Sequence, residues 1–182
     1  MTSLRLMLAT AATGCATMAM AQQMAGSEAD QDYAAALWEA MDAQSLVGTD
    51  PVLALPYPGT DPHGMMLETF YGDATVEGHS GVLVVKRNYG PEGVTADEVL
   101  EDPVEHLLSV TVMFQREDGY DPETNNWFWA KYLPDGSLDQ NPEGMALAGL
   151  VGKGADAGCI ACHEGAGGGD YLFTTDARLT EN

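Results

Sequence analysis

The chain has 182 residues, of which 45% are hydrophobic, and this length and composition fit one domain with a sizeable core. Seven Lys and Arg stand against 28 Asp and Glu, so the formal net charge is −21 at pH 7. Such an acidic chain repels phosphates, which excludes nucleic acid and anionic membrane surfaces as partners. The charge permits a basic redox partner protein, but solubility explains most of it, because the acidic residues are spread throughout the chain.

Residues 1–21 have the features of a signal peptide. Arg5 is the only charged residue of this segment, residues 6–12 are an apolar stretch, and Ala19-Met20-Ala21 is a small-residue cleavage site. We therefore expect export to the periplasm and a mature chain that begins at Gln22. The apolar stretch is too short to span a membrane, and no later segment reaches the necessary length.

A lipoprotein signal is the alternative interpretation of the same segment. Ala12-Thr13-Gly14-Cys15 would then be processed so that Cys15 carries the lipid. This interpretation leaves a very short apolar stretch before the cysteine and gives no role to the well-formed Ala-x-Ala site. A cleaved signal peptide therefore explains the segment better.

Irregular and helical segments follow the leader. Residues 22–31 are small and polar, and we expect them to be disordered. Residues 32–46 are predicted to be helical, because five large apolar residues lie near one helical face: Tyr33, Leu37, Trp38, Met41 and Leu46. Residues 49–64 are rich in Pro and Gly, which break regular structure. We assign residues 32–182 to a single domain.

The middle of the chain has the pattern of β-strands. Strands are predicted where apolar and β-branched residues gather or alternate, at residues 66–71, 81–87, 106–116 and 126–133. Turn signals separate them, at residues 73–74, 89–93, 118–119 and 133–136. Strands joined by turns rather than by long helices indicate an antiparallel sheet. A short helical turn at 156–164 and a short strand at 171–173 complete the prediction, whose fold class is α+β with a mainly antiparallel sheet.

The sequence Cys159-Ile160-Ala161-Cys162-His163 has the C-x-x-C-H pattern of covalent c-type haem attachment. The thiols of Cys159 and Cys162 would form thioethers with the haem vinyl groups, and His163 would bind the iron as its proximal ligand. We therefore expect one covalent haem c, held by the short C-terminal helix. Because the motif lies so late in the chain, the distal side of the haem must come from residues before it.

Three other interpretations of the two cysteines remain. A thioredoxin-like pair follows an early strand and begins a long helix, whereas this pair lies near the end of the chain. A zinc site needs further ligands, but the sequence has no second C-x-x-C, and Cys15 lies in the leader. A disulfide between Cys159 and Cys162 would close a short, strained loop. Haem attachment explains the motif best.

Several blocks of the sequence, in this order, resemble the cytochrome P-460 family, which includes the cytochromes c′-beta. The blocks run from Pro62 to about Thr175. They are Pro62-His63-Gly64, Gly81-Val82-Leu83-Val84-Val85-Lys86-Arg87-Asn88-Tyr89, Met113, Gly119-Tyr120-Asp121-Pro122, Asn126-Trp127-Phe128-Trp129-Ala130-Lys131-Tyr132, Pro134-Asp135-Gly136, the haem motif, and Asp170-Tyr171-Leu172-Phe173-Thr174. The resemblance implies a mainly antiparallel β fold, often a homodimer, and a five-coordinate haem with an open distal face.

Lys86 matches the lysine that enzymatic members of this family cross-link to the porphyrin. Those members resemble hydroxylamine oxidases, whereas the cytochromes c′-beta bind nitric oxide on a haem without the cross-link. The alternative for Lys86 is an edge-strand lysine that points to water, with Arg87 on the other face.

Enzymatic relatives also carry a distal carboxylate, which can accept protons from a substrate. On the matching strand this sequence has no acid, and Glu101 and Glu105 only precede it. Met113 and Phe70 are expected to form an apolar distal wall, which suits a small neutral ligand.

Further residues are candidates for the haem environment. His63 could bind the iron, although a His between a Pro-rich loop and a Gly is more often structural. His79 and His106 are expected in a turn and at a strand start. Met65, Met66 and Met145 are possible sixth ligands, but core packing is their more common role. At least one of Trp127 and Trp129 should face the core or the haem. The candidates for pairing with a haem propionate are Arg87, Arg116 and Arg178.

The sequence therefore predicts an exported monohaem protein that acts on a small nitrogen species. Lys86 favours hydroxylamine oxidation, the apolar distal wall favours nitric oxide binding, and the acidic charge is compatible with plain electron transfer.

Overall fold

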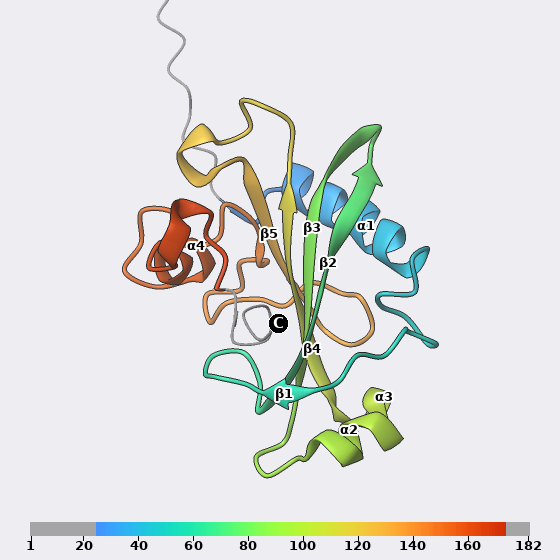
Figure 1. The fold of residues 1–182 in the computed structure, drawn as a ribbon. Helices are drawn as coiled ribbons and strands as arrows, with labels where there is room; N and C mark the ends of the chain where they lie inside the picture. The colour runs from blue at the N-terminus through green and yellow to red at the C-terminus, as the bar shows by residue number, and fades with distance from the viewer. Residues whose placement is uncertain (1–24, 174–182) are drawn as a thin grey trace, which may run out of the picture.

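The computed structural model describes residues 25–173, which form an α+β fold around a six-stranded antiparallel sheet (Figure 1). The predicted signal peptide and Arg178 lie outside the described residues. The helices are α1 (Glu28–Asp42), α2 (Ala96–Glu101), α3 (Pro103–His106) and α4 (Cys159–His163), with 3₁₀ turns at Pro122–Thr124 and Gly167–Gly169. The strands are β1 (Tyr57–Pro58), β2 (Met66–Val76), β3 (His79–Tyr89), β4 (Leu107–Gln115), β5 (Trp127–Tyr132) and β6 (Ala148–Gly149).

The spatial order of the strands is their order in the sequence, β1 to β6. The four long strands match the four predicted segments, and β2 and β3 are joined by a tight turn at Glu77 and Gly78, both with positive φ. The turn predicted at residues 73–74 is wrong. Asp73 and Ala74 pair with Val82 and Gly81, so β2 continues to Val76.

Helix α1 begins and ends four residues earlier than predicted. Ser27 caps it: its hydroxyl accepts a hydrogen bond from the Asp30 backbone N–H at 3.1 Å, and the Asp30 carboxylate accepts one from the Ser27 backbone N–H at 3.2 Å. This capping box fixes the first turn. Residues 28–31, which we expected to be disordered, are therefore helical, and residues 43–46 lie beyond the helix end.

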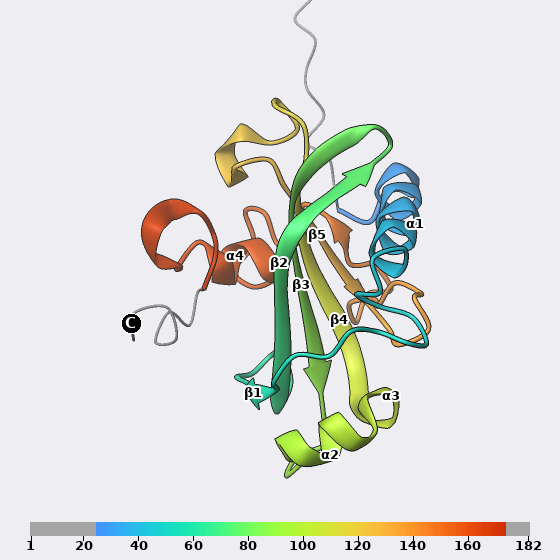
Figure 2. The same ribbon diagram turned by 45° about the vertical axis from the view of Figure 1, so that its right-hand side comes forward.

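The sheet separates two apolar layers (Figure 2). On one face, α1 packs against the sheet, and the main core lies between them. On the other face lie α4 and the loops around it, where Ile160 is packed with Trp127 and Trp129. Helices α2 and α3 lie at one end of the sheet, where Val99 of α2 packs against Tyr89.

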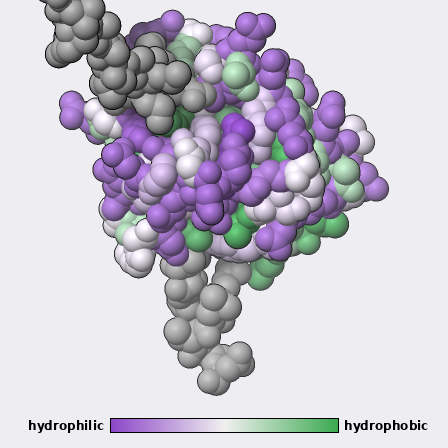
Figure 3. Space-filling model, turned by 90° about the horizontal axis from the view of Figure 1, so that it is seen from above, coloured by the Kyte–Doolittle hydropathy of each residue, from purple (hydrophilic) through white to green (hydrophobic). Residues whose placement is uncertain are grey.

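The C-terminal end of the described chain lacks a predicted strand, and the surface is mainly hydrophilic. Residues 171–173 do not form the predicted strand; Tyr171 has φ +65°, in the left-handed region, which interrupts an extended chain. Viewed from above, hydrophilic side chains cover most of the surface and apolar ones form separate patches (Figure 3). Within residues 25–173, no helix has the length and apolar character needed to cross a membrane.

Candidate functional site

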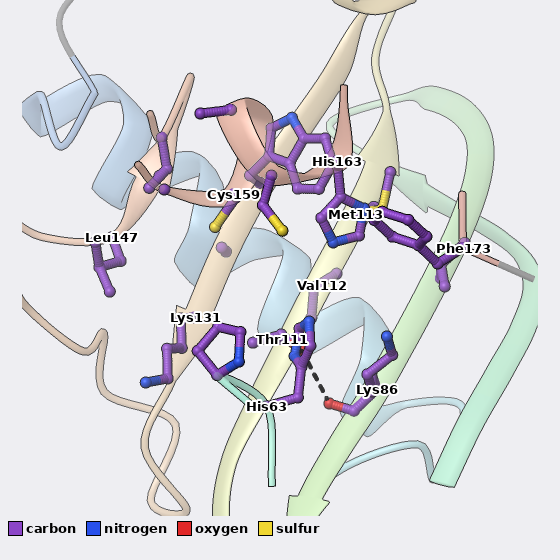
Figure 4. Close-up of a pocket in the computed structure, with 18 of the residues that line it drawn as sticks. His63, Lys86, Thr111, Val112, Met113, Lys131, Leu147, Cys159, His163 and Phe173 are labelled. Atoms are coloured by element: carbon purple, nitrogen blue, oxygen red, sulfur yellow. Dashed lines mark hydrogen bonds between the residues drawn. The ribbon is translucent and has the colours of Figure 1, made fainter. Parts of the chain in front are cut away.

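A cavity of about 570 Å³ lies between α4 and the sheet face that points away from α1 (Figure 4). Two rows of residues that pair across β2, β3, β4 and β5 form its floor. The polar row is Thr69, Lys86, Thr111 and Lys131, and the apolar row is Tyr71, Val84, Met113 and Trp129. Because side chains alternate along a strand, the row between these two points toward α1.

The sequence of α4 positions the C-x-x-C-H motif over this cavity. Ile160 is fully buried against Trp127 and Trp129, and its backbone N–H donates to the Val151 carbonyl at 3.0 Å. This spacer residue anchors the helix on the sheet. Cys159, Cys162 and His163 then line the cavity.

Both cysteines of the motif are free thiols. Burial raises the pKa of the Cys159 thiol to about 11, so it is protonated at neutral pH. Cys162 is exposed. The half-buried Cys159 and the exposed Cys162 both line the cavity, and two thiols on one side of a cavity are what covalent attachment of a haem edge requires.

His163 is held in one orientation. Its Nδ1 lies 2.6 Å from the Tyr171 carbonyl oxygen, to which it donates, so Nε2 keeps its lone pair. The ring also contacts Trp129 edge-on, with centroids 4.8 Å apart, and Phe173 at 5.2 Å. Burial lowers the pKa of His163 below its ordinary value. A neutral imidazole with a free Nε2 is the form that binds a metal.

His63 reaches the same cavity from the loop between β1 and β2. Its ring centroid lies 6.2 Å from that of His163, and the two rings are nearly perpendicular, at 84°. Figure 4 shows the two imidazoles pointing toward one another. Burial, and secondarily the charge of Lys86, lower the pKa of His63 to about 4, so this ring is also neutral at pH 7.

Lys86 lies at the centre of the sheet and lines the cavity. The alternative of an edge-strand lysine is therefore wrong, because β3 has β2 on one side and β4 on the other. Burial lowers the pKa of Lys86. The expectation that Arg87 points to the other face is confirmed: Arg87 is buried and forms an ion pair with Glu68 at 3.2 Å.

Several predicted site residues lie elsewhere. Phe70 is on the α1 face, where the Arg87 guanidinium stacks over its ring at 4.5 Å, so the prediction that it forms a distal wall with Met113 is corrected. Its cross-strand partner is Val85 rather than Lys86, which places it in a different row. Other candidates also lie away from the cavity: Met65, Met66, Met145, His79, His106, Arg116 and Trp127.

The described lining of the cavity contains one acidic residue, Asp156, which is exposed. Glu101 and Glu105 are in α2 and α3 and do not line the cavity. The cavity wall therefore offers hydroxyls, amines and imidazole rather than a buried carboxylate. Lys131, which the sequence did not single out, lies at the end of the polar row and is paired with Asp139 at 2.8 Å.

The residues present fit a haem. The cavity size is in the range of cofactor sites, and its walls are mostly apolar with a few polar groups. Trp129 lines the cavity, and its indole Nε1 is buried without a hydrogen-bond partner among the described residues. Lys86 and Lys131, which also line the cavity, offer donors for an anionic cofactor. In residues 25–173 no group of three or more His, Cys, Asp or Glu could hold a metal ion, but haem iron needs only one or two protein ligands.

Comparisons of the chain with protein-family models, with curated proteins and with solved structures found no match.

Proposed function

We propose that the chain is an exported c-type monohaem protein. Cys159 and Cys162 would hold the haem through thioethers, and His163 Nε2 would bind the iron. The single observation that supports this best is that the whole C-x-x-C-H motif lies on a short helix over a large, mostly apolar cavity. The hydrogen bond from His163 Nδ1 to the Tyr171 carbonyl supports the same role, since haem-ligating histidines are commonly oriented in this way.

Within that class, we propose a protein of the cytochrome P-460 type that handles small nitrogen species on the distal side of the haem. The haem would supply a redox-active iron that coordinates the nitrogen ligand. The chain supplies an apolar row of Val84, Met113 and Trp129 beside the polar row. The apolar row lies near His163, which Trp129 contacts, and the described cavity wall has no buried carboxylate for proton transfer, which favours binding of a neutral diatomic such as nitric oxide.

Hydroxylamine oxidation is the second candidate, and Lys86 favours it. Its amine lines the cavity, and its lowered pKa increases the neutral, nucleophilic fraction. A bond from Nζ to a porphyrin carbon would replace one N–H and one C–H, so its formation needs a two-electron oxidant such as a peroxide. Against this candidate, the described cavity wall lacks a buried carboxylate that could accept protons from the substrate.

One set of measurements on the mature protein tests both candidates. We expect a haem that remains attached after denaturation, nitric oxide binding by the ferrous protein, and no turnover of hydroxylamine. After digestion, the haem should remain on the peptide that contains Cys159 and Cys162 alone. A haem peptide joined to the Lys86 peptide, with hydroxylamine turnover that Lys86→Ala removes and Lys153→Ala retains, would instead support the enzyme. Lys153 is a suitable control because it pairs with Asp121 and does not line the cavity. A protein that binds no haem would refute the proposal.

A further inference from the structure

We propose that His63 is the second axial ligand of the haem iron, bound through Nε2 on the side opposite His163. This inference rests on the haem attachment proposed above and goes beyond it. The distal face of the haem is then closed at rest, and a small ligand reaches the iron only by displacing His63.

The main support for this proposal is the distance between the imidazole rings of His63 and His163. Metal–imidazole bonds are about 2 Å long, so an iron with two axial imidazoles holds the ring centres roughly 6 Å apart. The centroids of His63 and His163 are 6.2 Å apart. A further molecule between the iron and His63 would need a wider separation, by roughly the length of that molecule. The perpendicular rings are compatible with axial binding, because each ring plane can contain the axis that joins the two nitrogens.

Hydrogen bonds leave the lone pair of His63 Nε2 available. The Thr111 hydroxyl lies 3.5 Å from the Lys86 carbonyl oxygen, to which it can donate, and its oxygen accepts from the Asn88 side-chain amide at 3.3 Å. His63 Nδ1 lies 3.4 Å from the same oxygen. When the Thr111 hydroxyl donates to the Lys86 carbonyl, it accepts from His63, so Nδ1 carries the hydrogen. The outer partner of each histidine thus leaves Nε2 unprotonated, as the outer partners of metal-bound histidines do.

The loop between β1 and β2 is built to hold His63 over the sheet. Strand β1 pairs with β2, and the His63 backbone N–H donates to the Thr60 carbonyl at 2.9 Å. Gly64, the next residue, lies so close to β3 that a Cβ there would be 2.7 Å from the Tyr89 carbonyl oxygen. Only a glycine allows this approach, which sets the loop against the C-terminal end of β3.

Ligation by His63 has a measurable cost for ligand binding. If His63 occupies the iron in at least nine-tenths of the molecules, the apparent Kd for an added ligand rises about tenfold or more. Replacing His63 removes this competition. The ferrous His63→Ala protein should therefore bind carbon monoxide about tenfold or more tightly than the unaltered protein.

The test begins with haem content, measured by mass spectrometry of the denatured protein. A protein without covalent haem refutes the proposed function itself, whereas the following results concern His63 alone. For the loaded protein we expect a low-spin, six-coordinate ferric spectrum that becomes high-spin in His63→Ala. His106→Gln is the matched control, because His106 bonds to the Gly90 carbonyl outside the cavity and should leave the spectrum unchanged.

A measurement on the unaltered sequence covers the case in which His63→Ala fails to fold or to load haem. With ¹⁵N-histidine, magnetic resonance of the ferric protein should detect two iron-bound imidazoles. One bound imidazole, a high-spin resting protein, or a low-spin spectrum that survives His63→Ala would each overturn the proposal. If Lys86 or Met113 were the second iron ligand instead of His63, the protein would give one of these results.

Discussion

Replacing Glu68 by glutamine should lower the free energy of unfolding by about 3–5 kcal/mol, because it leaves a buried guanidinium without its counter-charge. Glu68 is 0% exposed and Arg87 is 1% exposed. They face each other directly across β2 and β3, with 3.2 Å between the guanidinium and the carboxylate. The same carboxylate accepts hydrogen bonds from the Ala54 backbone N–H at 2.6 Å and from the Tyr89 hydroxyl.

Urea unfolding of the mature, haem-loaded protein, followed by circular dichroism, measures this loss. With an m-value of about 2 kcal/mol/M, the midpoint should fall by about 1.5–2.5 M. A domain of this kind has a total stability of about 5–15 kcal/mol, so the variant would be close to unfolding at moderate temperature. Glu117→Gln is the control: its partner is Arg116 at 3.0 Å, but the Glu117 side chain is 50% exposed, and such pairs contribute about 0–1 kcal/mol.

A double variant, Glu68→Leu with Arg87→Met, separates the charge from the packing. When both charges are replaced by apolar groups of similar volume, the buried pair leaves no uncompensated ion, and most of the lost stability should return. A loss below about 1 kcal/mol in Glu68→Gln would refute the reasoning. A double variant that is less stable than Glu68→Gln would also refute the reasoning. In that case the other contacts of the two side chains, rather than the charge pair, would stabilise the fold.

Three further predictions concern burial and close packing. Ile160→Ala should cost about 2–5 kcal/mol in urea unfolding, because the side chain is fully buried, and it should lower the yield of haem attachment measured by mass spectrometry. Burial raises the pKa of Tyr33 to about 12; the folded state favours the neutral phenol, so this stabilisation is complete below pH 10 and is lost as the pH rises toward 12. Absorbance at alkaline pH should show Tyr33 ionising together with the loss of circular dichroism, and gradual ionisation in a folded protein would contradict this. Gly64→Ala should cost about 1–3 kcal/mol, since a Cβ there meets the backbone of Tyr89, whereas Gly72→Ala has open space and should be nearly neutral.

The long strands could be predicted because their apolar residues and turn signals are local features. The two shortest strands, β1 and β6, have two residues each and carry no such pattern. They form because neighbouring strands offer unpaired backbone groups. The start of α1 was missed because Asp30, rather than the more familiar Glu or Gln, completes its capping box with Ser27.

The site was predictable only in part. Cys159, Cys162 and His163 could be predicted to share one site because they form a local sequence motif. The family resemblance indicated Lys86. The prediction that Phe70 lines the cavity was wrong because alternation within one strand does not show which residues of two strands share a face. The pairing register between the strands decides this. His63 comes from an irregular loop, where no periodicity indicates the direction of a side chain.

The polar and charged residues of β3 connect the stability of the sheet to the site. Lys86 and Arg87 are neighbours in sequence and point to opposite faces, one into the cavity and one onto Glu68. A shift of the strand by one residue would bring Arg87 to the cavity and move Lys86 into the layer beneath α1. That arrangement would separate the Arg87 charge from Glu68 and leave Glu68 buried and uncompensated, at a cost of several kcal/mol. The buried ion pair therefore selects the register in which Lys86 and Thr111 lie side by side in the polar row, and Thr111 is the residue that orients His63.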